Sequence, residues 1–247
     1  MLQPPSAGHQ ASDAQILRFT FSRRLEDPRT QWLIAVYREV LSRLSLGFQF
    51  VDVPPARATL LVESGQADGE LGRTWGYGDL HPNLLRVPEP NNEVQFAAYV
   101  TSNRLGDNVP AWGRIRALGL VCEHRHGIQE LSELLARHLN PMQISKVITI
   151  EQGIRRLQLA RTDIYFDVRE GVEDYLAFGD ASAAARAGPK PRLLGIVQTT
   201  TGHAYLHRRH APRLAAISQT LRELKQEGFV ERYRLQMVEQ YLASKRR

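Results

Sequence analysis

The chain has 247 residues, of which 43% are hydrophobic and 23% charged, and this ordinary composition excludes a disordered chain or a coiled coil. Its formal charge is +6, but the basic residues are scattered and form no nucleic-acid-binding motif, so we expect no nucleic-acid partner. No apolar run approaches the ~18 residues that a membrane helix needs, so we expect no membrane span.

The first part of the chain predicts alternating strands and helices. Residues 16–21 alternate apolar and polar side chains, which is typical of a strand. Asp27 and Pro28 predict the start of a helix that ends near Leu46-Gly47, and residues 48–53 predict a second strand. A second helix follows Pro54 and leads through Asp68 into a third strand. This β-α-β-α-β order favours a parallel sheet with helices packed on it.

The middle of the chain repeats this order. Residues 79–92 predict a loop with a short strand at 84–87, and residues 95–101 predict a longer strand. The second set has strands at 118–122, 144–148 and 163–166 and helices at 128–139 and 151–160. Two similar sets predict two lobes of similar construction, with a ligand between them.

The last part of the chain predicts two further strands and two helices. We expect a flexible connection over 179–191, strands at 193–197 and 204–207, a helix from Pro212 to about 227 and a final helix over 229–243. Gly228 separates the two helices. Because these helices have no strands of their own, we expect them to pack on a sheet that is already built.

Three segments resemble a known family. Two of them are helix-to-strand segments that end in Gly65-Gln66-Ala67-Asp68-Gly69 and in Ala160-Arg161-Thr162-Asp163. The third is the closing segment, which begins Tyr205-Leu206-His207-Arg208-Arg209 and runs to Gly228-Phe229. From about Leu17 to Tyr241 the chain resembles type 2 periplasmic solute-binding proteins, in particular family 3, which serves amino-acid ABC transporters, as a divergent member. The resemblance implies an α/β fold of two lobes, each a mostly parallel sheet flanked by helices.

The resemblance also implies how the lobes are divided. Lobe 1 would comprise residues 1–102 and 197–247, lobe 2 would comprise residues 103–196, and strands near 95–101 and 193–197 would form the hinge. The lobes would close on a small-molecule ligand, and a permease or a membrane sensor would be the partner of a monomer. We expect a periplasmic location with the signal peptide already removed, since residues 1–15 contain no hydrophobic region.

One departure from the family concerns the ligand. Amino-acid binders of this family usually carry a Thr-x-x-Arg motif after the first Asp, and its Arg grips the ligand carboxylate. The segment from Gly72 to Pro82 has no such motif. The resemblance therefore supports the fold more strongly than an α-amino-acid ligand, and we expect a small polar ligand that is anionic or zwitterionic.

Ligands of open α/β folds meet the loops at the carboxyl ends of the strands. This rule selects Ser22-Arg23-Arg24, the loop after the third strand, the segment Glu123 to Gly127, and Tyr165-Phe166-Asp167. Arg73 is the first candidate, because a guanidinium can pair with a carboxylate or phosphate through two hydrogen bonds; a surface salt bridge is the alternative. The predicted ligand contacts are Arg23, Arg73, Thr74, Trp75, Arg125, His126, Tyr165 and Asp167.

Two other functions are compatible with the sequence. Some dehydratases of cyclohexadienyl acids resemble the same fold, and Glu123 or Asp167 would then supply the acid. A sensor that presents its closed form to a partner is a third function. The chain lacks the common catalytic and dinucleotide motifs, so we predict no catalytic residue and no cofactor.

Cysteine and histidine usage bears on metal binding. The single cysteine, Cys122, excludes a disulfide within the chain and a cysteine-based zinc site, and its apolar surroundings predict a buried thiol. The histidines at 203, 207 and 210 are the best metal candidates, but the expected turn separates them. We therefore predict no metal.

Overall fold

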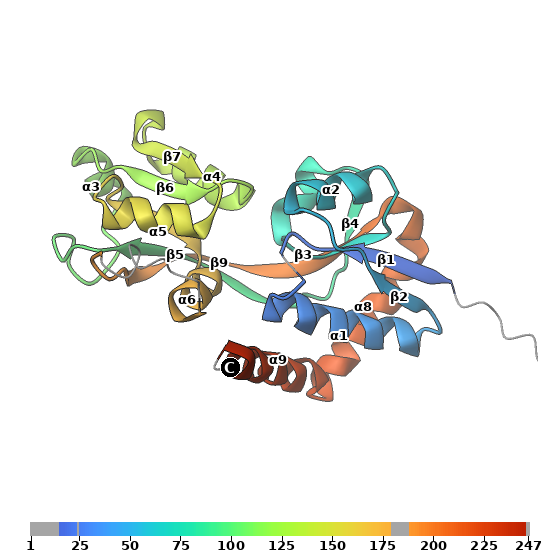
Figure 1. Ribbon diagram of the computed structural model, residues 1–247. Coiled ribbons are helices and arrows are strands. Elements are labelled where there is room, and N and C mark those ends of the chain that lie inside the picture. The colour runs from blue at the N-terminus through green and yellow to red at the C-terminus, as the bar shows by residue number, and fades with distance from the viewer. Residues whose placement is uncertain (1–14, 24, 179–187, 246–247) are drawn as a thin grey trace, which may run out of the picture.

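The computed structural model describes residues 15–23, 25–178 and 188–245. Two lobes lie side by side, and each contains part of one continuous sheet with helices packed against it (Figure 1). The predicted α/β class and the two-lobed arrangement are confirmed. Arg24 and most of the connection that we expected over 179–191 lie outside the described residues.

The first lobe begins with the predicted β-α-β-α-β order. Its elements are β1 (Ile16–Thr20), α1 (Pro28–Arg43), β2 (Gly47–Phe50), α2 (Pro55–Glu63) and β3 (Gly69–Thr74), followed by the 3-10 helix η1 (Trp75–Leu80) and β4 (Leu84–Arg86). Strand β1 pairs in parallel with both β2 and β3. Helix α1 starts as predicted, because the Asp27 carboxylate accepts the backbone N–H of Arg29 at 2.8 Å and Pro28 fits the first turn.

The second lobe repeats the order. The chain enters it along β5 (Asn92–Val100), and its elements are α3 (Trp112–Ala117), β6 (Cys122–Arg125), α4 (Gln129–His138), η2 (Pro141–Gln143), β7 (Ile144–Val147), α5 (Ile150–Gln158), β8 (Ile164–Val168) and α6 (Arg169–Phe178). Strand β6 pairs in parallel with β7 and β8. The strand expected at 118–122 starts later, at Cys122, because Leu118 and Gly119 end the unexpected helix α3 with a positive φ at Gly119. Helix α6 was also not expected.

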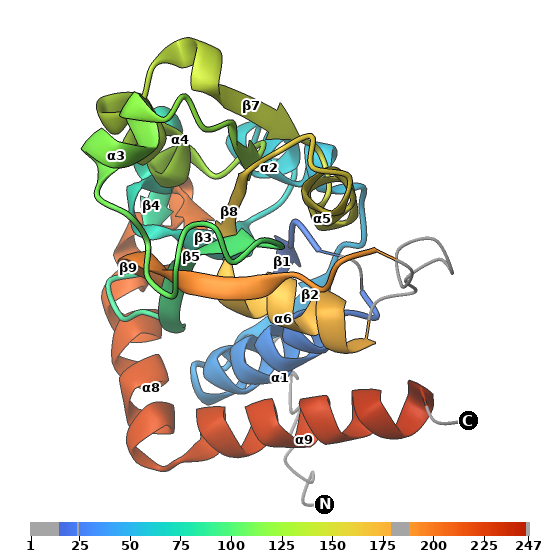
Figure 2. The ribbon, with the colours of Figure 1, turned by 90° about the vertical axis from the view of Figure 1, so that its left-hand side faces the viewer.

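The closing segment contains one long strand where two were expected. Strand β9 (Arg192–His207) is followed by η3 (Arg208–Arg213), α8 (Leu214–Gln226) and α9 (Phe229–Lys245). The residues between the two expected strands stay extended because they pair with β5 in an antiparallel ladder. Figure 2 shows α9 lying along α1, so the main partner of α9 is a helix and not the sheet on which we expected it to pack.

All described strands belong to one sheet, in the order β2-β1-β3-β9-β5-β8-β6-β7, with β4 also paired to β9. The buried side chains form separate clusters. One contains residues between Leu17 and Val87 and between Ala204 and Val230, and another contains residues between Val94 and Leu194. The lobes therefore have separate cores and share strands β5 and β9. Among the described residues, no helix is long and apolar enough to span a membrane.

Candidate functional site

The first lobe presents Arg73 at the end of β3, above a buried carboxylate. Arg73 Nε donates to Glu70 Oε1 at 2.8 Å, and Arg73 Nη2 donates to the Thr59 hydroxyl of α2 at 3.0 Å. The guanidinium also lies 4.6 Å from the ring centroid of Tyr77. Burial alone would lower the pKa of Arg73, but the Glu70 carboxylate outweighs it and raises that pKa above its ordinary value. These contacts fix both the charge and the position of Arg73.

The second lobe presents Arg125 at the end of β6 in a similar way. Arg125 donates to Asp167 of β8 through Nε at 3.0 Å and through Nη2 at 2.9 Å. The hydroxyl of Tyr165 donates to the same carboxylate at 2.5 Å. Burial opposes the charge of Arg125, but Asp167 raises the pKa of Arg125 above its ordinary value. Three residues predicted as ligand contacts therefore form one hydrogen-bonded group.

Arg23 follows β1 and reaches the second lobe. Its Nη1 donates to Asp27 at 3.1 Å, while its Nη2 lies 3.5 Å from the position that a Cβ on Gly171 of α6 would occupy. Burial, together with the charges of Arg29 and Arg125, lowers the pKa of Arg23 despite the opposing effect of Asp27. Arg125 also opposes the charge of Arg73. Arg23 and Arg73 of one lobe and Arg125 of the other thus lie close enough to interact electrostatically.

In each lobe the carboxylate lies beneath the guanidinium. The side chains of Glu70 and Asp167 are 0% exposed, whereas those of Arg73 and Arg125 are 17% and 28% exposed. The groups within reach of solvent are therefore N–H donors with positive charge. Such a surface is suited to carboxylate or phosphate oxygens.

The comparisons with known proteins agree with this architecture. No family model matches the chain. An "uncharacterized protein" of Shewanella oneidensis is 29% identical over 215 residues, which cover 85% of this chain and 79% of that protein. The crystal structure of a histidine kinase sensor domain with similarity to periplasmic binding proteins matches with a TM-score of 0.72 and 13% identity, over 91% of this chain and 96% of that one.

An amino acid ABC transporter substrate-binding protein from Streptococcus pneumoniae, solved with bound L-arginine, matches with a TM-score of 0.68 and 10% identity over 92% of this chain and 95% of that one. The chain has the fold of a type 2 periplasmic binding protein. The resemblance predicted from the two helix-to-strand segments and the closing segment is thus confirmed for the fold. Identities of this size carry no conclusion about the ligand.

Three predicted ligand contacts lie apart from the hydrogen-bonded groups of Arg73 and Arg125. Trp75 is 52% exposed, lies beneath the Arg86 guanidinium at 3.2 Å and meets the edge of the His203 ring. The carbonyl of Thr74 accepts the Tyr205 hydroxyl at 2.8 Å. His126 is exposed, and its backbone N–H donates to Val147 at 2.8 Å. The structure gives each of these residues a local partner within its own lobe.

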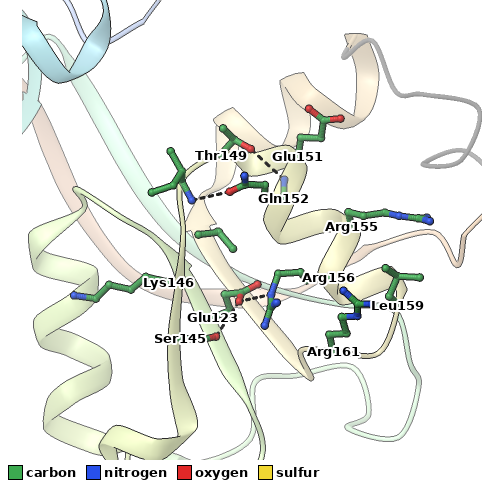
Figure 3. Close-up of a pocket in the computed structure, with 12 residues that line it drawn as sticks. Glu123, Ser145, Lys146, Thr149, Glu151, Gln152, Arg155, Arg156, Leu159 and Arg161 are labelled. Atoms are coloured by element: carbon green, nitrogen blue, oxygen red, sulfur yellow. Dashed lines mark hydrogen bonds and ion pairs between the residues drawn. The ribbon is translucent and has the colours of Figure 1, made fainter.

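A pocket of about 790 Å³ lies beside β7 and α5, on the second lobe (Figure 3). Glu123 lies in its wall, 0% exposed, and accepts hydrogen bonds from Arg156 Nε at 2.6 Å and from the Ser145 hydroxyl at 2.8 Å. The other basic residues of the pocket are Lys146, Arg155 and Arg161. Glu123 is therefore held in an ion pair, as is Asp167, the second acid considered for a dehydratase.

Direct contacts join the two lobes. Arg29 of α1 forms ion pairs with Glu170 and Asp174 of α6, the second of them at 3.0 Å. The backbone N–H of Gly76 in η1 donates to Glu130 of α4 at 2.9 Å. These residues were not expected from the sequence. The spacing of Glu170 and Asp174, one helical turn apart, was the available signal, but it required knowing that α6 exists.

The histidines considered for zinc have separate roles. His203 contacts the Val87 carbonyl and the Thr201 hydroxyl, both at 2.8 Å, while His210 contacts Asp68 at 2.6 Å. Cys122 is buried, and burial raises the pKa of its thiol to about 12. Within residues 15–23, 25–178 and 188–245, no group of three or more His, Cys, Asp or Glu side chains is arranged to hold a metal ion.

Proposed function

We propose that this protein is an extracytoplasmic solute-binding protein that captures a small anionic or zwitterionic molecule between its lobes. The observation that carries the proposal is that strand ends of both lobes present arginines, Arg23, Arg73 and Arg125, and that the charge of Arg125 opposes the charges of the other two. Like charges repel one another, and an anion bound among them would relieve that repulsion. Tyr165 and Asp167 would hold Arg125 in place, and Thr74, Trp75 and His126 remain predicted contacts at the edge of the site.

The proposal includes the lobe division of residues 1–102 with 197–247 and residues 103–196, and a hinge near 95–101 and 193–197. Its support is that β5 and β9 pair along these stretches, with register shifts between Phe96 and Ala97 and between Ala98 and Tyr99. Irregular pairing of this kind leaves fewer regular ladder bonds to oppose a change of twist. Closure around the ligand would hold the two arginine-bearing strand ends together.

A permease or a membrane sensor would recognise the closed form. Both roles occur among the matched structures, one of which is an ABC transporter component and another a kinase sensor domain. We propose binding without turnover, because Glu123 and Asp167 are both fully buried and both held by arginines. A general acid must instead lie within hydrogen-bonding reach of its substrate.

Thermal unfolding in the presence of candidate ligands tests the proposal. A ligand at 100 times its Kd adds about 2.7 kcal/mol to the free energy of unfolding. At about 2 to 4 °C per kcal/mol for a chain of this size, Tm should rise by about 5 to 10 °C. The panel comprises amino acids, carboxylates and phosphorylated metabolites, and a panel with no stabilising member would contradict the proposal.

Substitutions then locate the site. Arg73→Lys and Arg125→Lys keep the positive charge beside Glu70 and Asp167, but a lysine cannot bind that carboxylate and also offer a separate Nη1 to a ligand, so each should weaken binding at least about 10-fold. Arg116→Lys, at an exposed position in α3, is the matched control and should leave the affinity unchanged. Equal losses in all three variants would place the ligand elsewhere.

A further inference from the structure

One hydrogen bond joins the two lobes beside the predicted ligand contacts. Glu130 lies in the first turn of α4, in the second lobe, and its Oε1 accepts the backbone N–H of Gly76 at 2.9 Å. Gly76 belongs to η1, which directly follows Thr74, and the Thr74 side chain makes no hydrogen bond that caps η1. The acceptor for the start of η1 therefore comes from the other lobe, and separation of the lobes would remove it.

The other oxygen of the Glu130 carboxylate is unsatisfied. Oε2 is buried and, among the described residues, has neither a hydrogen-bond nor an ion-pair partner. A buried carboxylate oxygen without a donor has lost its hydration with nothing to replace it, so this burial is unfavourable. Glu130 also packs closely on η1, since a Cβ on Gly76 would lie 3.4 Å from Glu130 Cγ. Separation of the lobes would break the hydrogen bond but return water to Oε2, so the two effects oppose one another.

A second contact joins the lobes through α1 and α6. Arg29 of α1 forms ion pairs with Glu170 and with Asp174, the second of them at 3.0 Å. Burial alone would lower the pKa of Arg29, but the two carboxylates outweigh it and raise that pKa above its ordinary value. Each of these three charges has a partner of opposite sign, in contrast to Oε2 of Glu130. The α6 contact is therefore the better satisfied of the two.

The two contacts lie on opposite faces of β5, a strand that both lobes share. Successive side chains of a strand point to opposite faces. Phe96 of β5 belongs to a core that also contains Leu131 of α4. Its neighbour Ala97 belongs to a different core, which contains Val172 of α6. Figure 1 and Figure 2 both show α4 and α6 on opposite sides of β5 and β9. Bending of the shared strands can therefore open the lobes on the α4 side while the α6 contact stays formed.

We propose that Glu130 is a latch between the lobes, which bonds to Gly76 in the closed form and releases it when the lobes open about β5 and β9. Glu130 acts through Gly76 on the preceding residues 73–75, which contain three predicted ligand contacts, so it is a positioning residue. This inference rests on the lobe motion of the proposed function but on no particular ligand. The weaker contact opens, and the α6 contact serves as the pivot.

Distances between spin labels test the latch in the full chain, with no ligand added. One label pair, Leu60→Cys in α2 and Met142→Cys in η2, spans the lobes at exposed positions. Helix α2 shares a core with η1, so this pair reports on the α4 side. The other pair, Leu176→Cys in α6 and Leu235→Cys in α9, is also exposed and lies on the α6 side. The thiol of Cys122 is buried, out of reach of the label.

Three substitutions are compared in both labelled chains. Glu130→Ala removes the hydrogen bond and should raise the ratio of open to closed molecules at least about 5-fold, seen as longer distances in the first pair only. Glu130→Gln retains an acceptor oxygen for Gly76 and should restore most of the closed form. Glu133→Ala, at an exposed position in the same helix, is the matched control and should leave both distances unchanged.

Four outcomes would overturn the latch. They are a first distance that is unchanged in Glu130→Ala, an equal change in Glu133→Ala, a Glu130→Gln variant as open as Glu130→Ala, and a lengthening of both distances, which would mean general loosening. None of them bears on solute binding, because thermal unfolding with the ligand panel tests that function separately.

Discussion

Replacement of Arg125 by methionine should destabilise the protein through the carboxylate that it leaves behind. Arg125 donates to Asp167 through Nε and Nη2, and the carboxylate is fully buried. Removing one partner of a buried ion pair costs about 3 to 5 kcal/mol. Because Arg125 itself is 28% exposed, and Tyr165 and Val168 still donate to Asp167, we expect the lower end, about 3 kcal/mol.

A double-mutant cycle separates this cost from the loss of packing. Asn at position 167 can still accept from Tyr165 and Val168 but carries no charge, so the variant Arg125→Met with Asp167→Asn should lose only about 1 kcal/mol. At about 2 to 4 °C per kcal/mol, Tm should fall by about 6 to 12 °C in Arg125→Met and by about 2 to 4 °C in the double variant. Scanning calorimetry measures both. A double variant no more stable than Arg125→Met would refute the reasoning.

Two further predictions concern packing and pH. A Cβ on Gly153 of α5 would lie 2.2 Å from the buried ring of Tyr165, so Gly153→Ala should lower the free energy of unfolding, measured in urea, by about 3 kcal/mol or more. The control is Gly113→Ala in α3, where nothing lies within 4 Å of the added Cβ, and it should be neutral or slightly stabilising. Equal effects of the two substitutions would contradict the packing argument. Burial lowers the pKa of His124 and of His203. Below about pH 6.5 the unfolded chain therefore binds more protons than the folded chain. The free energy of unfolding should fall as the pH drops from 7 toward 5. His203→Gln should reduce that slope, and an unchanged slope would exclude His203 as its source.

The sequence was sufficient to predict the helices and strands that depend on neighbouring residues, but not those that depend on contacts with distant parts of the chain. Alternation and helix caps located both β-α-β-α-β sets, because those signals are contained within a few neighbouring residues. Strand β9 was divided in two because the polar run from Gln198 to Gly202 lacks a strand pattern of its own; pairing with β5, about 100 residues earlier in the chain, keeps it extended. Helix α6 was missed because it follows β8 directly, with Gly171 in its first turn.

The same distinction applies to the candidate site. The strand-end rule selected Arg23, Arg73 and Arg125, but it could not show that Glu70 would anchor Arg73. In a regular strand, residues three apart point to opposite faces. The irregularity between Glu70 and Arg73, where β3 pairs with β9, allows both side chains to meet. Because the partner strand lies at least 130 residues away, the local sequence did not reveal this contact.

Strand β9 also determines the order in which the molecule can be completed during synthesis. The strands β5, β6, β7 and β8 all lie between Asn92 and Val168, so the sheet of the second lobe can form as soon as this stretch has left the ribosome. Strand β3 acquires its second neighbour only when β9 emerges, and Gly69 then pairs with Leu206. The lobe that begins the chain must therefore wait, with one edge of its sheet open, until nearly all of the protein has been made.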